Sequence, residues 1–477
     1  MAAPSPPAEP ALPRLRGGLG GSHTVVTYPP LDVLDPLEGA EPFTLDPVDG
    51  VHLYFHVAFC EFICMFCHYQ RVLTGIEKEN GGVPTYVDAI LAEIELRRPG
   101  LAGSTIQSVY LGGGTPTSLS LCQLERLVEG IDGLVDLKPN WFCFETSPIA
   151  TVKGGGAAKI AMLAARGADR VSLGVQSFDN SILFSQRGHS AEVVDEALAI
   201  LRPYGFVLNI DLIQDLPFQT EASIDGDLAA IATHRPEQVT WYTLRAQRGS
   251  SLAKVQGSHS SQDHHLLSGI ASGSDSVRRR LQIIDGMEAL GYETRPGGRF
   301  ALPDQRRDLY KSVRQGLESA LLGFGVSAYS HGWGHIFRNI SGHNDLKAIR
   351  RYVETVMAGR SPIATCMAVN ELEQTAAAVV TGIRDRLPAA YLDRDDPTGS
   401  AWRQSASWCV AEGLIELQDG VYRLTRTGRA LEEEIAFMFY SVPVREALAR
   451  KTDSGADRKG RRQEFGAGEL RQKEGST

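Results

Sequence analysis

The sequence predicts an α/β protein: an open barrel of strand–helix units, followed by a smaller helical unit. Short runs rich in β-branched and aromatic residues recur from about residue 50, helix-length amphipathic segments separate them, and a helix–hairpin–helix pattern follows them. The six runs are VHLYFHVAF (51–59), IQSVYLG (106–112), WFCFETS (141–147), RVSLGVQ (170–176), FVLNIDLI (206–213) and QVTWYTL (238–244).

The segments between these runs are predicted to be crossover helices. Residues 85–98 form one amphipathic segment and residues 190–205 another, with Ser190 in the N-cap and Gly205 in the C-cap position. Strand–helix–strand units of this kind build a parallel sheet, so the expected fold is an open (β/α)6 barrel. Barrels of this type place their chemistry at the carboxyl ends of the strands.

The later part of the chain is predicted to form a second, smaller unit. Residues 250–275 are rich in Ser, Gly and His and are expected to be a loop, with a helix at 276–290. Residues 371–383 and 400–413 read as helices, 414–425 as a hairpin turning at Asp419-Gly420, and 426–440 as a further helix. Helices around a hairpin suggest a winged-helix-like module.

Composition indicates a globular protein. The chain has 477 residues, 43% hydrophobic content and a net charge of −9, which argues against a nucleic-acid binder. No apolar run approaches a membrane span, and the Pro/Ala/Gly-rich start lacks a signal-peptide core, so we expect a cytoplasmic protein. The expected divisions are a disordered leader (1–22), a covering segment (23–50), the barrel (51–330), a C-terminal domain (331–450) and a disordered tail (451–477).

Three of the seven cysteines cluster in FHVAFCEFICMFCHYQ (55–70). Cys60, Cys64 and Cys67 directly follow the first predicted strand. A structural zinc site usually needs four protein ligands, and no second pair is present; Cys122, Cys143, Cys366 and Cys409 stand apart and read as ordinary thiols. A [4Fe–4S] cluster held by three thiolates would leave one iron open for a substrate or cofactor.

The Cys-x3-Cys-x2-Cys stretch resembles the signature of the radical S-adenosylmethionine (radical SAM) superfamily. The wider pattern resembles its oxygen-independent coproporphyrinogen III oxidase-like (HemN-like) branch, from about residue 28 to about residue 440. Further motifs follow in the order of that branch: YLGGGTPT (110–117), FETSP (144–148), RVSLGVQSF (170–178), NIDLIQDLPFQT (209–220) and LLGFGVSAYS (321–330).

The resemblance implies one [4Fe–4S] cluster on Cys60, Cys64 and Cys67, and two SAM molecules. For the first SAM it implies contacts from Tyr54, Gly113, Gly114, Thr115 and Glu145. For the second SAM it implies contacts from Phe66, Gln176, Arg187 and Asp211. It also implies that the backbone near Thr243 and Tyr329 contacts adenine. An internal salt bridge is the alternative reading of Glu145, and a surface helix position is that of Arg187.

Two positions depart from the branch. Coproporphyrinogen oxidases carry a further cysteine where this chain has Tyr69, and the usual glycine before LP is Asp215. His68 and Tyr69 follow the last cluster thiol and are expected near the reacting centre, His68 as a proton acceptor or as a structural residue of the loop. The TYPPL segment (27–31) resembles the piece that lines the cavity in this branch.

These departures lead to a prediction of a class C radical SAM methyltransferase or cyclopropanase, acting on an unsaturated carbon of a natural-product intermediate, as in antibiotic biosynthesis. The alternatives are a coproporphyrinogen III dehydrogenase, which decarboxylates propionates, and a haem chaperone of the same fold. The expected partners are a small-molecule substrate, an electron donor such as flavodoxin or ferredoxin, and a methyltransferase of the same pathway. Neither nucleic acid nor membrane is expected as a partner.

Overall fold

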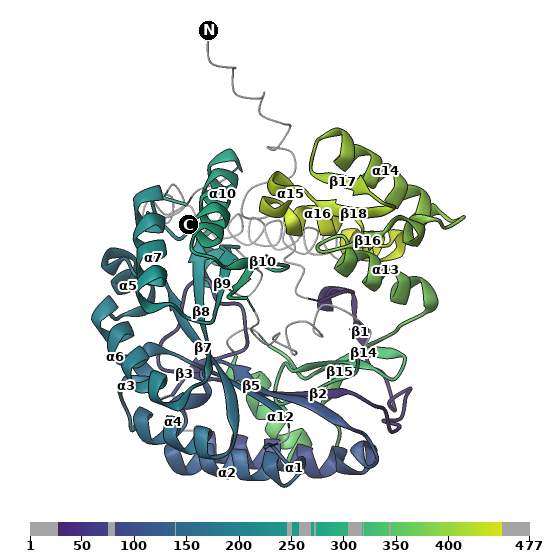
Figure 1. Ribbon diagram of the computed structural model, residues 1–477. Coiled ribbons are helices and arrows are strands. Elements are labelled where there is room, and N and C mark those ends of the chain that lie inside the picture. The colour runs from purple at the N-terminus through teal and green to yellow at the C-terminus, as the bar shows by residue number, and fades with distance from the viewer. Residues whose placement is uncertain are drawn as a thin grey trace, which may run out of the picture.

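The structure is a computed structural model that describes residues 27–74, 82–138, 140–245, 250–256, 269–270, 273–303, 317, 319–342 and 345–450. Figure 1 shows an arc of strands with helices along its outer side, and a smaller helical unit facing the open part of the arc. The expected disordered leader (1–22) and tail (451–477) lie outside the described residues, and the domain boundaries stay predictions.

The six predicted barrel strands are confirmed. Each pairs in parallel with the next in chain order, so the strand–helix alternation was interpreted correctly. The sheet does not close, because its outermost strands, β1 and β10, do not pair with each other. The bounds are β2 Val51–Val57, β5 Ile106–Gly113, β6 Trp141–Thr146, β7 Ala168–Gln176, β8 Val207–Gln214 and β9 Gln238–Thr243.

Seven further strands extend this sheet to 13 strands. β12 lies parallel to β2, and β13, β14, β15 and β1 follow antiparallel, while β11 and β10 extend the opposite edge. They were not predicted as strands, since they are short and carry little alternation. Their bounds are β12 Leu321–Phe324, β13 Tyr329–Gly332, β14 His335–Asn339, β15 Ile363–Ala368, β1 Asp35–Pro36, β11 Arg299–Ala301 and β10 Glu293–Arg295.

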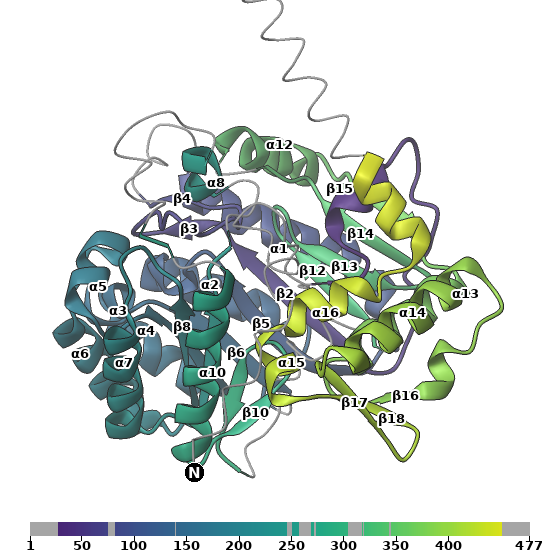
Figure 2. The same ribbon diagram turned by 90° about the horizontal axis from the view of Figure 1, so that it is seen from above.

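Helices cover the outer face of the arc (Figures 1 and 2). The predicted segment 85–98 lies within α1, and 190–205 comprises α6 and a short 3-10 turn that ends at Gly205, whose φ is +68°. Ser190 is the N-cap residue of α6, but its side chain makes no capping hydrogen bond. The bounds are α1 Gly82–Leu101, α2 Leu121–Asp132, α3 Pro148–Val152, α4 Gly156–Ala165, α5 Asn180–Arg187, α6 Ala191–Leu201, α7 Glu221–His234, α10 Gly273–Ala289 and α12 Leu346–Met357.

The two faces of the parallel sheet differ in polarity. Alternate residues of each strand, such as Leu53 and Phe55 in β2, pack into one hydrophobic core with the covering helices. The intervening residues form the inner face, and many of them are polar. They include His52, Tyr54 and His56 in β2, Ser108 and Tyr110 in β5, Glu145 in β6, Arg170 and Ser172 in β7, and Asn209 and Asp211 in β8. This arc therefore presents a polar inner surface that is suited to ligands.

Two expected elements differ in the structure. Residues 250–275 are not all loop: α8 (Ser251–Gln256) forms because Leu252 is buried and its amide donates to the Met65 carbonyl at 3.0 Å. The helix expected over 426–440 is divided into α15 (Arg426–Ala430) and α16 (Glu432–Met438).

The C-terminal unit has its own apolar cluster. Its hairpin turns at Asp419 and Gly420, both with positive φ, as the Asp-Gly pair predicts. Tyr28 of the covering segment is buried in the same cluster and donates to Glu373 at 2.7 Å. The bounds are α13 Glu371–Gly382, β16 Leu387–Pro388, α14 Pro397–Ala411, β17 Ile415–Gln418 and β18 Val421–Leu424.

Candidate cluster and cofactor site

The three-cysteine loop lies at the carboxyl end of β2. It begins at β3 (Phe59–Cys60) and returns at β4 (Val72–Leu73), which pairs with β3 in parallel. Arg71 is 1% exposed and fastens the loop from inside, donating to the carbonyl of Cys64 at 2.6 Å and to that of Tyr69 at 3.0 Å. No sequence pattern predicts this role of Arg71, because backbone carbonyls accept its hydrogen bonds.

The thiols fit an iron–sulfur cluster better than a single ion. All three are free, and Cys60 and Cys64 are buried. Within the described residues no three His, Cys, Asp or Glu side chains converge closely enough to hold one metal ion. Burial raises the pKa of Cys60 to about 12, so bound iron would be needed to stabilise its thiolate. Three soft sulfur donors on one loop suit an iron–sulfur cluster.

The glycine motif after β5 lies directly against this loop. Gly114 and Thr115 donate their amides to the carbonyls of Val57 and Phe59, each at 2.7 Å, and the Thr115 hydroxyl lies 3.6 Å from the Cys60 sulfur. A Cβ on Gly114 would stand 2.4 Å from the Phe59 carbonyl oxygen, so no side chain fits there. The backbone of β5 can therefore approach the cluster loop only with glycine at this position.

Glu145 ends β6 beside the same motif. Its carboxylate accepts from the Tyr110 hydroxyl at 2.7 Å and from the Gly113 amide at 3.1 Å. Gly113 has a φ of +110°, a conformation that glycine adopts without strain. The carboxylate is thus held at the carboxyl end of the strands, the position that the SAM-binding hypothesis requires. Tyr110 was not predicted, although its place two residues before the glycines puts it on the inner face.

Tyr54 and Tyr329 share the inner face, where they belong to one buried cluster with Tyr110. The Tyr54 hydroxyl lies 2.9 Å from Nδ1 of His56, whose Nε2 lies 2.9 Å from the Gln70 carbonyl. A carbonyl only accepts, so Nε2 carries the proton and Nδ1 accepts from Tyr54. Burial lowers the pKa of His56 to about 4, and the ring is therefore neutral near pH 7.

Three of the four residues predicted for a second SAM, all except Phe66, lie around Gly174 of β7. A Cβ there would stand 3.1 Å from the Gln176 amide nitrogen and 3.6 Å from Nη2 of Arg187, and Gly174 pairs with Asp211 across the strands. Gln176 has a φ of +79° at a break in the β7–β8 register, which redirects its side chain. Asp211 accepts from Ser172 and Asn209, each at 2.8 Å.

Arg187 is not a surface helix residue. Its guanidinium donates to the sulfur of Cys64 at 2.9 Å and to the carbonyl of Gly174 at 2.8 Å. It therefore joins the cluster loop to the end of β7. Phe66, from the same loop, packs against a separate apolar cluster that includes Ile213 and Leu252.

His68 and Tyr69 lie side by side on the loop. Their rings stack with centroids 4.5 Å apart, and both side chains are partly exposed. A catalytic role for His68 or Tyr69 stays a prediction.

Asp215, which replaces the usual glycine, has a φ of +67°. This explains why glycine is usual there, since few other residues adopt this conformation readily. The Asp215 carboxylate accepts from Ser276, and from Gln214 at 3.1 Å, and lies 3.6 Å from Arg279. These contacts hold the turn against α10.

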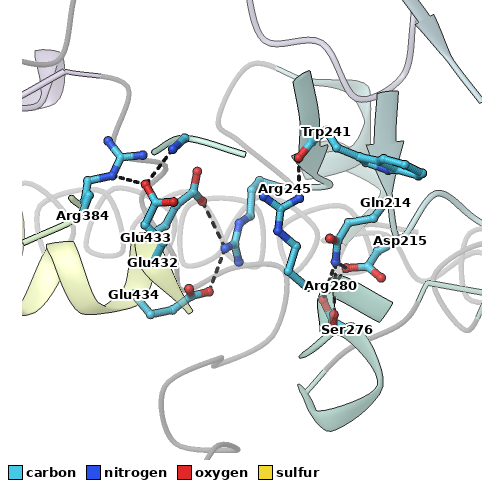
Figure 3. A network of polar contacts seen from close by, with 11 residues as sticks. Gln214, Asp215, Trp241, Arg245, Ser276, Arg280, Arg384, Glu432, Glu433 and Glu434 are labelled. Atoms are coloured by element: carbon cyan, nitrogen blue, oxygen red, sulfur yellow. Dashed lines mark hydrogen bonds and ion pairs between the residues drawn. The ribbon is translucent and has the colours of Figure 1, made fainter. Parts of the chain in front are cut away.

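Thr243 ends β9 beside the junction with the C-terminal unit. It lines a small cavity with Arg245 and the acidic start of α16. Figure 3 shows Arg245 between Glu433 and Glu434, at 3.2 and 2.7 Å, and Glu432 accepts from Arg384 and, at 2.7 Å, from the Gly297 amide. The C-terminal unit is thereby fixed to the end of the last parallel strand.

Asp227 of α7 supports the turn that follows Gln176. Its carboxyl group accepts from the Ser177 hydroxyl at 3.0 Å and from the Phe178 amide at 2.6 Å. Burial outweighs these bonds and raises the pKa of Asp227 to about 7. The folded state thus holds a proton that an unfolded chain, with an Asp pKa of about 3.9, releases.

We expect this proton to make the folded state less stable as pH rises. Between about pH 4 and pH 7 the folded chain binds more protons than the unfolded chain, so the free energy of unfolding falls across this window. Asp227→Asn removes that contribution, and its melting temperature should fall less than that of the wild type. Asp225→Asn, an exposed change on the same helix, should keep the wild-type slope. Equal slopes for Asp227→Asn and the wild type would contradict the assignment.

Comparison with known proteins agrees with this geometry. Residues 54–229 match the Radical SAM superfamily, and such a match implies a [4Fe–4S] cluster and SAM. The match and the relatives below support the HemN-like branch of that superfamily.

The chain is 25% identical to the oxygen-independent coproporphyrinogen III oxidase of Pseudomonas aeruginosa over 412 residues, which cover 81% of this chain and 85% of that protein. It is 32% identical to the heme chaperone HemW of Lactococcus lactis over 196 residues, 40% of this chain and only about half (48%) of that protein. The solved structure of coproporphyrinogen III oxidase (HemN) from Escherichia coli shares the fold, with a TM-score of 0.68 and 23% identity over 87% of this chain and 96% of that one.

The predicted methylation or cyclopropanation of a natural product is wrong. These relatives are coproporphyrinogen oxidases and a heme chaperone, so a methyltransferase subtype and a role in antibiotic biosynthesis have no support. The prediction gave too much weight to the departures at Tyr69 and Asp215. At Asp215 the constraint is the backbone conformation, a positive φ.

No helix among the described residues is long and apolar enough to cross a membrane. The cytoplasmic location, the electron donor and any partner enzyme stay predictions.

Proposed function

We propose that the chain is an oxygen-independent coproporphyrinogen III dehydrogenase, which removes propionate carboxyl groups from a reduced tetrapyrrole. The observation that supports this proposal most is the extent of the likeness: the Pseudomonas aeruginosa oxidase aligns over 85% of its length.

The chain's own residues would bind and orient the reactants. Cys60, Cys64 and Cys67 would hold the cluster, and Glu145 with the Gly113–Thr115 backbone would hold SAM beside it. When bound, the cluster and SAM supply a radical that takes one hydrogen atom from a propionate. The carboxyl group then leaves as CO₂, and one electron passes to an external acceptor, which leaves a vinyl group.

We further propose that a second SAM binds next to the first. Gln176, Arg187 and Asp211 meet around Gly174, and Arg187 also contacts the Cys64 sulfur. A ligand held by these three residues would lie directly beside the cluster. Equilibrium binding of SAM to the reconstituted protein should then give two molecules per chain.

A haem chaperone is the second candidate, since the 32% identity to HemW and the loss of a cysteine at Tyr69 both favour it. Anaerobic incubation with coproporphyrinogen III, SAM, a chemical reductant for the cluster and an added one-electron acceptor separates the two. The dehydrogenase should release CO₂ and form 5′-deoxyadenosine in proportion to the divinyl product. Stoichiometric haem binding with no CO₂ from coproporphyrinogen would instead support the chaperone.

A further inference from the structure

Arg338 stands on the inner face of the sheet, in β14. Side chains alternate along this strand: Phe337 packs into the core under the outer helices, and Ile336 belongs to the cluster of Tyr28 and the C-terminal unit. Arg338 shares the side of Ile336, and its cross-strand neighbour is Tyr329 of β13. Figure 2 shows β14 and β13 on the side of the arc nearest the C-terminal helices.

The guanidinium of Arg338 is poorly satisfied. Among the residues that the structure describes, no carboxylate lies within 4.0 Å of it, and its one hydrogen bond runs from Nε to the Ser327 carbonyl at a long 3.4 Å. Two other largely buried arginines have carboxylate partners, since Arg97 pairs with Glu93 at 2.9 Å and Arg245 with Glu434 at 2.7 Å. A partly buried cation with no carboxylate in contact is costly, and a bound anion would offset that cost.

A second polar group beside Arg338 is also unsatisfied. The hydroxyl of Ser327 is buried and has no hydrogen-bond partner among the described residues. Burial lowers the pKa of Arg338, and the one carboxylate that opposes this, Asp32, lies on the exposed surface of the covering segment. A negatively charged acceptor would therefore satisfy both the Arg338 guanidinium and the Ser327 hydroxyl.

Arg338 lies within electrostatic range of the cofactor site. Besides burial, the positive charge of Arg338 lowers the pKa of His56. His56 contacts Tyr54 and the carbonyl of Gln70, a residue three positions after Cys67. A guanidinium offers a planar fork of donors that matches a carboxylate in two parallel bonds. An anion held by Arg338 would thus lie on the inner face beside Tyr329, which packs in one cluster with Tyr54 and Tyr110.

We propose that Arg338 anchors a propionate carboxylate of the tetrapyrrole, which rests on the proposed function. A carboxylate of the substrate would then bind to β14, on the other side of the open sheet from β7 and β8. Arg338 orients the substrate and takes no part in bond breaking.

The test compares coproporphyrin III with its tetramethyl ester, which has the same ring but no carboxylates. Fluorescence titration of the reconstituted full chain should show tighter binding of the acid. Arg338→Gln should weaken acid binding by about ten- to a hundredfold, as loss of a charge-assisted hydrogen bond predicts, and leave the ester unchanged. Arg338→Lys, which keeps the charge but loses the fork, should fall between them. Arg351→Gln, an exposed change on α12, should match the wild type.

Three outcomes separate the two proposals. Unchanged acid binding by Arg338→Gln overturns the anchor, whatever the enzyme does. Weakened binding of both coproporphyrin III and haem by Arg338→Gln, with no CO₂ released by the wild type, keeps the anchor and removes the dehydrogenase. Substrate-independent SAM cleavage should stay at the wild-type rate in Arg338→Gln, and its loss would show that Arg338 supports the cofactor site instead.

Discussion

Replacing Cys64 by alanine is expected to abolish SAM cleavage, because a cluster with only two thiolates cannot present one open iron in a fixed position. The wild-type chain should bind about four irons after anaerobic reconstitution, and Cys64→Ala should retain fewer. The Cys64 sulfur also accepts a hydrogen bond from the Arg187 guanidinium at 2.9 Å. Loss of this sulfur therefore also loosens the link between the loop and the end of β7. The measurements are iron content per chain and 5′-deoxyadenosine formed with a chemical reductant.

A second cysteine provides the matched control. Cys122 is exposed on α2 and far from the loop in sequence, so Cys122→Ala should bind iron and cleave SAM as the wild type does. Retained SAM cleavage in Cys64→Ala, or its loss in Cys122→Ala, would contradict the assignment of the three ligands.

The strands and the thiol loop could be predicted from the sequence because both are local patterns. β2 and β7, for example, are runs of β-branched and aromatic residues between turn signals, and the cysteine spacing needs no tertiary information. The strands β12 to β15, which continue the sheet beyond β2, could not be predicted in this way. β12 has only four residues, and it pairs with β2, which lies more than 260 residues earlier in the chain.

Only those residues of the site that lie in local sequence motifs could be predicted. The glycines after β5 and Glu145 lie in motifs, whereas Arg71 and Asp227 act through backbone groups that a sequence does not display. Arg187 could be read as a surface residue, since only the folded chain shows its contact with Cys64. Asp215 misled the prediction of function, because a residue change was interpreted as a change of chemistry when the backbone conformation was the constraint.

Gly114→Ala is expected to disrupt the cluster although it removes no ligand. The added Cβ would stand 2.4 Å from the Phe59 carbonyl oxygen, 2.9 Å from that of Val57 and 3.0 Å from the Cys60 sulfur. Backbone atoms cannot move aside as a flexible side chain can, so the strand that leads into the loop must shift and carry Cys60 with it. Overpacking of this kind costs about 1–3 kcal/mol, and a misplacement of about 1 Å at a reacting centre can lower a rate about a hundredfold.

The control for Gly114→Ala is a glycine-to-alanine change at a position with space for the added Cβ. A Cβ on Gly226 of α7 would meet nothing within 4 Å, and alanine in a helix is favoured by about 1 kcal/mol, so Gly226→Ala should be at least as stable as the wild type and equally active. Gly114→Ala should lose iron and at least about a hundredfold of SAM cleavage, while its far-ultraviolet circular dichroism stays native. A full cluster and normal cleavage in Gly114→Ala would show that β5 does not press against the cluster loop, and that the glycine there serves another purpose.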